Sequence, residues 1–339
     1  MSHEHAVRPE RRRRKNGLAV ACTFAAALLS APAVAQDYPS RPIRMLIGFN
    51  PGGSSDVSGR AVARKMSEAL NTPIVIENRS GAGGNIAADI TAKANPDGYT
   101  LFWSGVGPLM VSPALGVKLS YDPFKDFVPV GRGVVFCNVL IANQQLPANN
   151  VKELIALARA KPGSLNYATP GIGSAGHLGG ELLKSLSKTD IVHIAFKGGG
   201  EMITNLIGGQ VQLAFVTITT ARSFGGSRVK VLAVTSAKRD PAMPEIPTMA
   251  EGGVPGYDAT FMYGLVTAAR TPPAIVARLN KELRAALGDA EVNKHLGPAG
   301  LVPAPTSGEE YGRIIRAEYA KWYKVLAPIR AKGAGAGQL

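Results

Sequence analysis

A regular alternation of short apolar runs with longer amphipathic segments constrains the fold of this chain more than any other feature. It begins with the apolar run "IRMLIGF" (43–49), which precedes the amphipathic segment "SDVSGRAVARKMSEAL" (55–70). Short apolar runs bounded by turn residues are typical of buried strands, and strands that alternate with helices form βαβ units. The chain is therefore predicted to be an α/β protein with mostly parallel sheets.

The predicted elements fall into two sets on either side of a long β-rich segment, 127–143. The first set comprises strands at 43–49, 73–78 and 99–104 and helices at 55–70 and 85–94. The second set comprises helices at 151–160, 175–186 and 200–209 and strands at 165–169, 191–196, 211–218 and 229–236. Another extended segment, 259–269, leads to two final helices, at 273–287 and 308–328.

Because two extended segments bracket the second set, we expect one lobe to be interrupted by another. A chain of 339 residues is long enough for two lobes. We place the two hinge strands near Asn138–Asn143 and Thr260–Leu265. Lobe 1 is then expected to comprise 36–138 and 265–339, and lobe 2 to comprise 139–264 with the hinge crossings.

The first 35 residues have the pattern of an export signal. A basic stretch, "RRRRKNG", precedes the apolar core "LAVACTFAAALLS", and Ala33 and Ala35 fit a small-x-small cleavage site. That core is short for a membrane-spanning helix, and the context of Cys22 does not favour lipid attachment. We expect cleavage near Ala35 and export to the periplasm, by either the general or the twin-arginine route.

Charge and composition exclude several classes of function. Without residues 1–35, 32 of the 38 Lys and Arg and 22 of the 24 Asp and Glu remain, and the basic residues are too scattered for a nucleic-acid stripe. Cys137 is the single cysteine left, so no intrachain disulfide is expected. The histidines His177, His193 and His295 are too dispersed to predict a metal site. We expect no metal and no cofactor.

The first glycine-rich loop, "NPGGSSD" (50–56), lies between a predicted strand and a predicted helix. Gly52 and Gly53 let the backbone turn tightly, and Ser54 or Ser55 is placed to cap the helix that contains Asp56. Free amides at a helix N-terminus bind carboxylate or phosphate groups. This loop therefore predicts either an anion site or an ordinary capped helix, and no Gly-Lys-Ser/Thr follows to make it a Walker motif.

A second loop, "GIGSAGH" (171–177), repeats the arrangement with Gly173, Ser174 and Ala175 before a predicted helix. It matches Gly-x-Gly-x-x-Gly, but Asp190 precedes the next strand, whereas the ribose-binding acid of a dinucleotide site ends it. Ile172 stands where a nucleophile elbow needs glycine. His177 is one turn into the helix, where it either supports a bound anion or packs locally; His193 is expected in the core.

A third loop, "FKGGGEM" (196–202), also links a strand to a helix and contains Lys197 and Gly198. Three such loops in two lobes indicate that their helix dipoles converge on one cleft. This arrangement is typical of a binding protein that closes on its ligand.

At these residues the chain resembles the periplasmic solute receptors of tripartite tricarboxylate transporters, the Bug family. The similarity extends over the mature chain and includes "YPSRPIR", "PGGSSD", "IENRSGAGGNIAA", "NPDGYTL", "KPGSLNYATPGIGSAGHL" and "VHIAFKGGG". It implies a two-lobed periplasmic binding fold of type II, no catalysis, and a ligand carboxylate held between the first and second loops. The residues it assigns to ligand binding are Gly52, Gly53, Ser54, Ser55, Asp56, Gly173, Ser174, Ala175, His177, Gly198 and Val216.

Several positions depart from the pattern of the family. Val216 stands where many relatives carry an aspartate that pairs with a ligand amino group. Other polar residues of relatives are replaced by Gln212, Pro108, Leu109, Met262 and Phe196. Burying an amine against Val216 would leave its charge unpaired, at a cost of several kcal/mol. We therefore expect a ligand without an amino group and with a relatively apolar far end.

The sequence as a whole predicts a monomeric, non-enzymatic receptor that delivers a small organic carboxylate to a membrane transporter. Two alternatives remain open at this stage: an exported hydrolase that uses Ser174 and His177, and a sensor that presents its ligand to a signalling partner. The hydrolase lacks a complete set of catalytic groups in the sequence.

Overall fold

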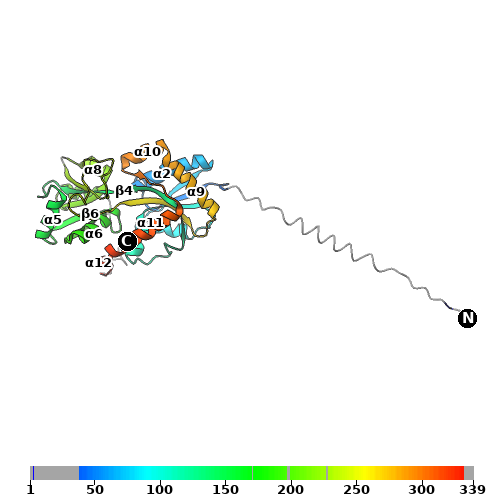
Figure 1. Cartoon of the computed structure of the whole chain (residues 1–339), viewed down its shortest axis with the longest axis horizontal. Helices are drawn as coiled ribbons and strands as arrows, with labels where there is room; N and C mark the ends of the chain where they lie inside the picture. The colour runs from blue at the N-terminus through cyan, green and yellow to red at the C-terminus, as the bar shows by residue number, and fades with distance from the viewer. Residues whose placement is uncertain (1–2, 4–37, 170, 197–198, 227, 332–339) are drawn as a thin grey trace. The chain divides into compact units, whose positions relative to one another are not determined.

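The computed structural model describes residue 3 and residues 38–169, 171–196, 199–226 and 228–331. All the named strands and helices lie in the unit Arg41–Leu339 (Figure 1). The predicted export signal and its cleavage site lie outside the described residues, apart from His3. Within the described residues, no helix has the length and apolar character needed to cross a membrane.

Within the described residues, the first sheet has six strands in the order β11-β4-β10-β3-β1-β2. Strand β1 pairs in parallel with both β2 and β3, as expected of consecutive βαβ units. The strands are β1 (Ile43–Ile47), β2 (Ile74–Asn78), β3 (Thr100–Ser104), β4 (Phe127–Phe136), β10 (Phe261–Ala268) and β11 (Val302–Pro303).

The second sheet has five described strands in the order β7-β6-β8-β5-β9. Strand β6 pairs in parallel with β7 and β8, whereas β5 pairs antiparallel with β8 and β9. The strands are β5 (Asn138–Asn143), β6 (Leu165–Thr169), β7 (Ile191–Ala195), β8 (Leu213–Thr217) and β9 (Val229–Val234).

The two sheets are joined where β4 passes into β5. Only Cys137 separates the last residue of β4, in the first sheet, from the first residue of β5, in the second. The chain returns through β10, which pairs antiparallel with β4 over its whole length, and the two strands run side by side in Figure 1. The chain leaves the first sheet along β4 and returns along β10 in the opposite direction, so the two strands pair antiparallel. Both sheets contain antiparallel pairs and are therefore more mixed than the predicted "mostly parallel".

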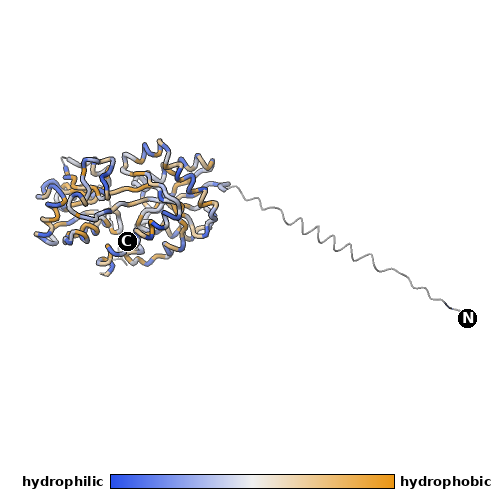
Figure 2. The backbone as a smooth tube through the Cα atoms, in the orientation of Figure 1, coloured by the Kyte–Doolittle hydropathy of each residue, from blue (hydrophilic) through white to orange (hydrophobic). Residues whose placement is uncertain are grey.

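Helices flank both sheets, and the apolar strands lie inside them (Figure 2). In the part of the chain that contributes to the first sheet, the helices are α2 (Ser54–Leu70), α3 (Asn85–Ala92), α4 (Ser112–Ala114), α9 (Pro273–Gly288), α10 (Ala290–Leu296), α11 (Gly308–Val325) and α12 (Ala327–Ala331). In the part that contributes to the second, they are α5 (Val151–Ala160), α6 (Ala175–Ser187), α7 (Gly199–Ile207) and α8 (Ile218–Phe224). Short helical turns occur at η1 (Ala82–Gly84), η2 (Gly107–Val111) and η3 (Gly297–Ala299).

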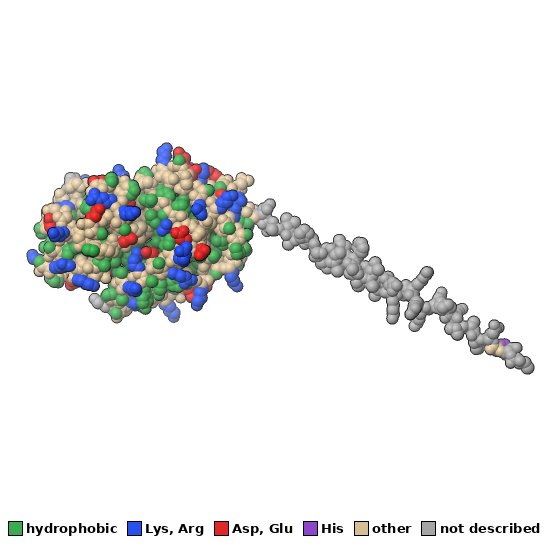
Figure 3. All heavy atoms as spheres, viewed as in Figure 1, with side chains coloured by type: hydrophobic (Ala, Val, Ile, Leu, Met, Phe, Trp, Pro, Cys, Tyr) green, Lys and Arg blue, Asp and Glu red, His purple; other side chains and the backbone are tan. Residues whose placement is uncertain are grey.

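The structure confirms the predicted α/β architecture with two sheets. The division into lobes at residues 138/139 and 264/265 stays a prediction. Acidic and basic side chains alternate over the face seen in Figure 3, as the scattered charges of the sequence lead one to expect.

Candidate binding site between the two sheets

A cavity of about 770 Å³ lies between the two sheets, and we call it the inter-sheet cavity. Elements of the first sheet contribute Phe49, Ser54 and Tyr263 to its lining, together with the backbone turn Gly105–Gly107. Elements of the second sheet contribute the second loop, the helices α7 and α8, and the end of β8. Both predicted anion loops therefore open into the same space.

The first loop is held in shape by Asp56. The Gly52 amide donates to Asp56 Oδ2 at 3.0 Å, and both Arg60 and Asn78 donate to the same carboxylate. Burial raises the pKa of Asp56, but these hydrogen bonds and the Arg60 charge outweigh it, so the pKa lies below its ordinary value. Asp56 is 4% exposed and does not line the cavity, so its carboxylate stabilises the loop without facing the ligand.

The start of α2 leaves its backbone donors available. No side chain caps the helix, because the N-cap is Gly53; the predicted caps Ser54 and Ser55 are instead its first two residues, and Ser54 turns toward β10. The hydroxyl groups of Ser54 and Tyr263 lie 2.8 Å apart. The first N–H groups of a helix have no intrahelical partner, and they carry the positive end of its dipole.

The second loop uses its polar side chains to fix its own conformation. Ser174 is the N-cap of α6; its Oγ accepts from the His177 amide at 3.2 Å and donates to the Gly171 carbonyl at 2.7 Å. The Gly173 amide donates to His177 Nδ1 at 3.2 Å. The donors left for a ligand are the backbone N–H groups of Ala175 and Gly176, which line the cavity in the first turn of α6.

Two histidine rings pack against each other at a tilt beneath this loop. The rings of His177 and His193 are 4.5 Å apart between centroids, and His193 Nε2 is 2.7 Å from Thr169 Oγ1. Burial lowers the pKa of His177 to about 4 and that of His193 to about 3. Both rings are therefore neutral near pH 7, and His177 is a buried loop support that does not line the cavity.

The remaining predicted site residues are distributed unevenly. Val216, at the end of β8, lines the cavity, whereas Gly52, Gly53 and Ser55 do not. Gly198 and Lys197 lie outside the described residues, but Gly200 of the same loop lines the cavity. Of the six departures from the family pattern, the cavity lining includes Val216 but not Gln212, Pro108, Leu109, Met262 or Phe196.

The charge among the described lining residues of the cavity is of one sign, positive. Among the described residues that line it there is no Asp or Glu, and the single charged side chain is Arg228. Together with the starts of α2 and α6, this lining favours an anion over a cation. Among the described residues, no group of three or more His, Cys, Asp or Glu is placed to hold a metal ion.

Comparison with known proteins identifies the family. The family described as "tripartite tricarboxylate transporter family receptor" matches residues 59–330, more than half of the chain. The chain belongs to this receptor family. The relative BugT of Bordetella pertussis is 34% identical over 311 residues, which cover 91% of this chain and 95% of BugT.

Solved structures of similar proteins agree with this tripartite tricarboxylate transporter family receptor in fold. Rpa4515 of R. palustris, solved with adipate, has a TM-score of 0.74 at 34% identity, covering 86% of this chain and 98% of its own. MatC of Rhodopseudomonas palustris, solved with bound malate, has a TM-score of 0.74 at 32% identity, and the match covers 85% of this chain and 100% of the MatC chain. The fold is the two-lobed periplasmic binding fold of type II, as the resemblance implied.

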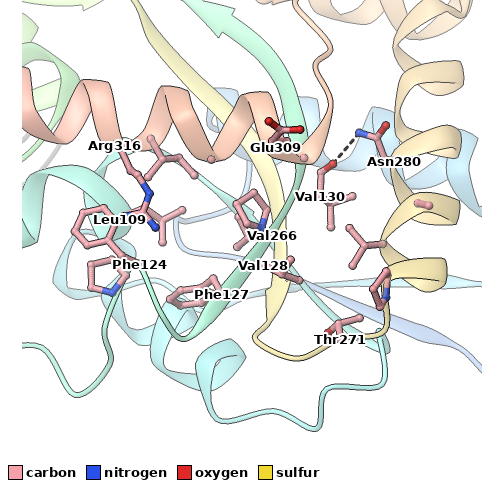
Figure 4. Close-up of a pocket in the computed structure, with 18 residues that line it drawn as sticks. Leu109, Phe124, Phe127, Val128, Val130, Val266, Thr271, Asn280, Glu309 and Arg316 are labelled. Carbon is pink, nitrogen blue, oxygen red and sulfur yellow. Dashed lines mark hydrogen bonds between the residues drawn. The ribbon is translucent and has the colours of Figure 1, made fainter.

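A second cavity, of about 500 Å³, lies elsewhere in the receptor, between α9, α11 and β4 (Figure 4). Its labelled lining is mostly apolar, with Glu309 and Arg316 on α11 and with Asn280 donating to the Val130 carbonyl. None of the predicted loop residues reaches it. The inter-sheet cavity, to which both sheets contribute, is therefore the candidate binding site.

The sequence reading missed several residues that line the receptor's cavity. Phe136 and Tyr263 stack at 4.7 Å between ring centroids, and Asn138 follows them across the β4–β5 junction. Asn138 and Tyr263 come from the segments predicted as hinges, Phe136 lies just before the first of them, and a hinge strand of a two-lobed protein passes the cleft. Their position at or beside the predicted hinges was the sequence signal that could have identified them as lining residues.

Proposed function

We propose that this protein is a periplasmic receptor that captures a small organic carboxylate in the inter-sheet cavity. The observation that carries the proposal is the convergence of two helix N-termini, those of α2 and α6, on one cavity from two different sheets. The first residue of each helix, Ser54 or Ala175, lines the cavity, and a carboxylate between them would accept from the free N–H groups at both helix starts. Binding that bridges two lobes favours their closed arrangement.

The chemical class of the ligand follows from the lining. A ligand amino group would find no carboxylate among the described lining residues, and Val216 stands where relatives offer one. An unpaired buried ammonium costs several kcal/mol. The ligand we propose therefore has a carboxylate and lacks an amino group, in keeping with relatives solved with adipate and malate.

The geometry of Ser174 and His177 argues against the hydrolase. His177 Nδ1 is occupied by the Gly173 amide, and Ser174 Oγ bonds to backbone atoms and not to the imidazole ring. Nucleophilic serine needs a base that takes its proton. We propose a non-enzymatic role in which the loaded receptor is delivered to the membrane subunits of a transporter.

A thermal-shift screen tests the proposal. Mono-, di- and tricarboxylates, aromatic acids and amino acids are added in turn, because a ligand that binds only the folded protein raises its Tm. We expect one or more carboxylates without an amino group to raise the Tm the most. If an amino acid raises it more than every simple acid, or if only another ligand class does so, the proposal is wrong.

A further inference from the structure

The side-chain amide of Asn138 lines the inter-sheet cavity and has no hydrogen-bond partner among the described residues. Asn138 is the first residue of β5 and is 5% exposed. Its backbone is held by Thr235, whose Oγ1 accepts from the Asn138 N–H and whose N–H donates to the Asn138 carbonyl, both at 2.8 Å. A buried amide without a partner is unfavourable, so this one is placed to pair with a group from outside the protein.

The hydroxyl groups of the described lining differ from this amide, because each has a partner within the protein. These are the hydroxyls of Ser54, Ser174, Thr204, Thr217, Thr220 and Tyr263, which pair with one another or with a backbone carbonyl of their own loop or helix. Asn138 is therefore the neutral polar side chain of the described lining that has both its donor and its acceptor unused.

Strand pairing places the Asn138 side chain on the face of the sheet where α6 begins. Asn138 pairs with Thr217 of β8, and residues directly opposite in an antiparallel pair share a face. Phe215, two residues before Thr217, is on the same face. A Cβ at Gly176, in the first turn of α6, would lie 3.2 Å from the Phe215 Cβ, so the start of this helix packs directly there.

The chain on the other side of Asn138 leads to the start of α2. Phe136, two residues earlier, stacks on Tyr263 at 4.7 Å between ring centroids, and the Tyr263 hydroxyl lies 2.8 Å from that of Ser54, the first residue of α2. Short contacts thus link Asn138 to both helix starts. A ligand group close to a carboxylate bound at these helix starts is the one that Asn138 can reach.

From these observations we infer that Asn138 is a specificity-determining residue, which selects acids with a hydroxyl group close to the bound carboxylate. An amide offers N–H donors and a carbonyl acceptor, and a hydroxyl group can pair with both because it donates and accepts. An acid without the hydroxyl would leave the amide buried and unpaired, and a site of this kind disfavours such an analogue. This inference rests on the proposed function and specifies its substrate class.

Calorimetric titration of the purified full chain tests the inference with six acids. Butyrate and glutarate are each compared with their 2-hydroxy and 3-hydroxy derivatives, so that only the hydroxyl group changes within a set. We expect at least one hydroxy derivative to bind at least ten-fold more tightly than its parent acid, as one or two buried hydrogen bonds would produce. Parent acids that bind as tightly as all their derivatives would overturn the inference.

Asn138→Leu and Asn293→Leu form a matched pair. Asn293, on α10, also has a buried amide oxygen without a partner, but it does not line the cavity. Asn138→Leu is expected to reduce the preference for the hydroxy acid to less than two-fold and to leave the Tm of the free protein unchanged or higher, because an unpartnered amide is removed. Asn293→Leu should keep the preference. A merely structural role for Asn138 would instead lower the Tm and weaken both acids of a pair equally.

The remaining outcomes separate this inference from the proposed function. If folded Asn138→Leu keeps the preference, or if none of the six acids binds while another carboxylate does, the inference is wrong and the proposed function stands. If no acid binds and an amino acid does, the proposed function fails, and the inference with it.

Discussion

The hydroxyl group of Tyr263, on the returning strand β10, lies 2.8 Å from that of Ser54 at the start of α2. The tyrosine ring is stacked on Phe136 of β4, so the first loop is tied to the two strands that run toward the second sheet. Burial raises the pKa of Tyr263 to about 12, and its hydroxyl is therefore protonated at neutral pH. The first loop, which we propose contacts the ligand, is in this way fixed to the strands β4 and β10 that lead to and from the second sheet.

Tyr263→Phe removes that hydrogen bond and keeps the stacked ring. Because a hydrogen bond contributes about 1 kcal/mol, we expect the Kd of the bound carboxylate to rise about five-fold with little change in fold. Isothermal titration of the variant measures the effect, and Tyr323→Phe, at an exposed position outside the cavity, is the control. An unchanged Kd in Tyr263→Phe would show that the contact does not orient the loop.

Buried His177 and half-buried His193 predict a loss of stability in mild acid. The folded pKa of His177, about 4, lies below its ordinary value of 6.5, so the unfolded chain takes up a proton first as the pH falls. Stability is therefore full above pH 6.5 and declines between pH 6.5 and 4, by up to about 3 kcal/mol for this residue. The window lies above the ordinary pKa of 3.8 for a carboxylate such as Asp56.

Urea unfolding at pH 7.5 and 4.5 measures this decline. His177→Asn keeps an acceptor for the Gly173 amide but does not titrate, so it should lose about 2 kcal/mol less than the wild type between the two pH values. His193, whose pKa is also lowered, remains in the variant and accounts for a residual decline. Equal declines in both proteins would contradict the assignment.

Two helical glycines are predicted to respond in opposite directions to alanine. In α6, a Cβ at Gly180 would collide with the buried ring of Tyr167, whereas at Gly312 in α11 the nearest atom, of Pro129, lies 3.5 Å away. We expect Gly180→Ala to lower the free energy of unfolding by about 1–3 kcal/mol through overpacking. Gly312→Ala should raise it by up to about 1 kcal/mol, since alanine favours the helix. Chemical denaturation measures the free energy of unfolding of both variants. A more stable Gly180→Ala variant would contradict the packing of Gly180 against Tyr167.

Val216→Asp tests whether Val216 makes the cavity unfavourable for ligands that carry an amino group. A carboxylate at this lining position would repel an acid ligand, so we expect at least a ten-fold loss in acid affinity together with measurable binding of glutamate or aspartate. Val216→Thr, which has a similar shape and no charge, serves as the control. Undiminished acid binding in Val216→Asp would place the ligand away from β8.

The sequence predicted the main elements of the fold because their signals are local. Apolar runs and helical periodicity can be recognised within a short stretch of sequence. The predicted bounds of β1, α2 and β6 are therefore close to the observed ones. A hinge strand was predicted at Asn138–Asn143, but "VVFCNVL" is continuously β-rich, and only the pairing of β4 and β5 with different sheets shows that one strand ends before Cys137 and another begins after it. The helices α8 and α10 were missed because each has only seven residues.

The site was predicted in part for the same reason. The glycine-rich loops are local motifs, and both described loops do reach the cavity. Which loop groups face the cavity depends on hydrogen bonds that form only in the folded loop. The hydrogen bonds of Asp56 and His177, for example, hold these side chains against their own loops and out of the cavity lining. Tyr263 on β10 is brought to the cavity by strand pairing over a long sequence separation, and Arg228 by the pairing of the adjacent strand β9, which no local pattern records.

The central claim, that backbone N–H groups at helix starts hold the carboxylate, can be tested by removing one of them. Ala175 is the first residue of α6, a position where proline is tolerated because its N–H has no intrahelical partner. Ala290→Pro makes the same change at the first residue of α10, which does not line the cavity. Titration with the acid that raises the Tm most should show at least a ten-fold weaker Kd for Ala175→Pro and no change for Ala290→Pro, with both proteins folded. Wild-type affinity in folded Ala175→Pro would contradict the claim.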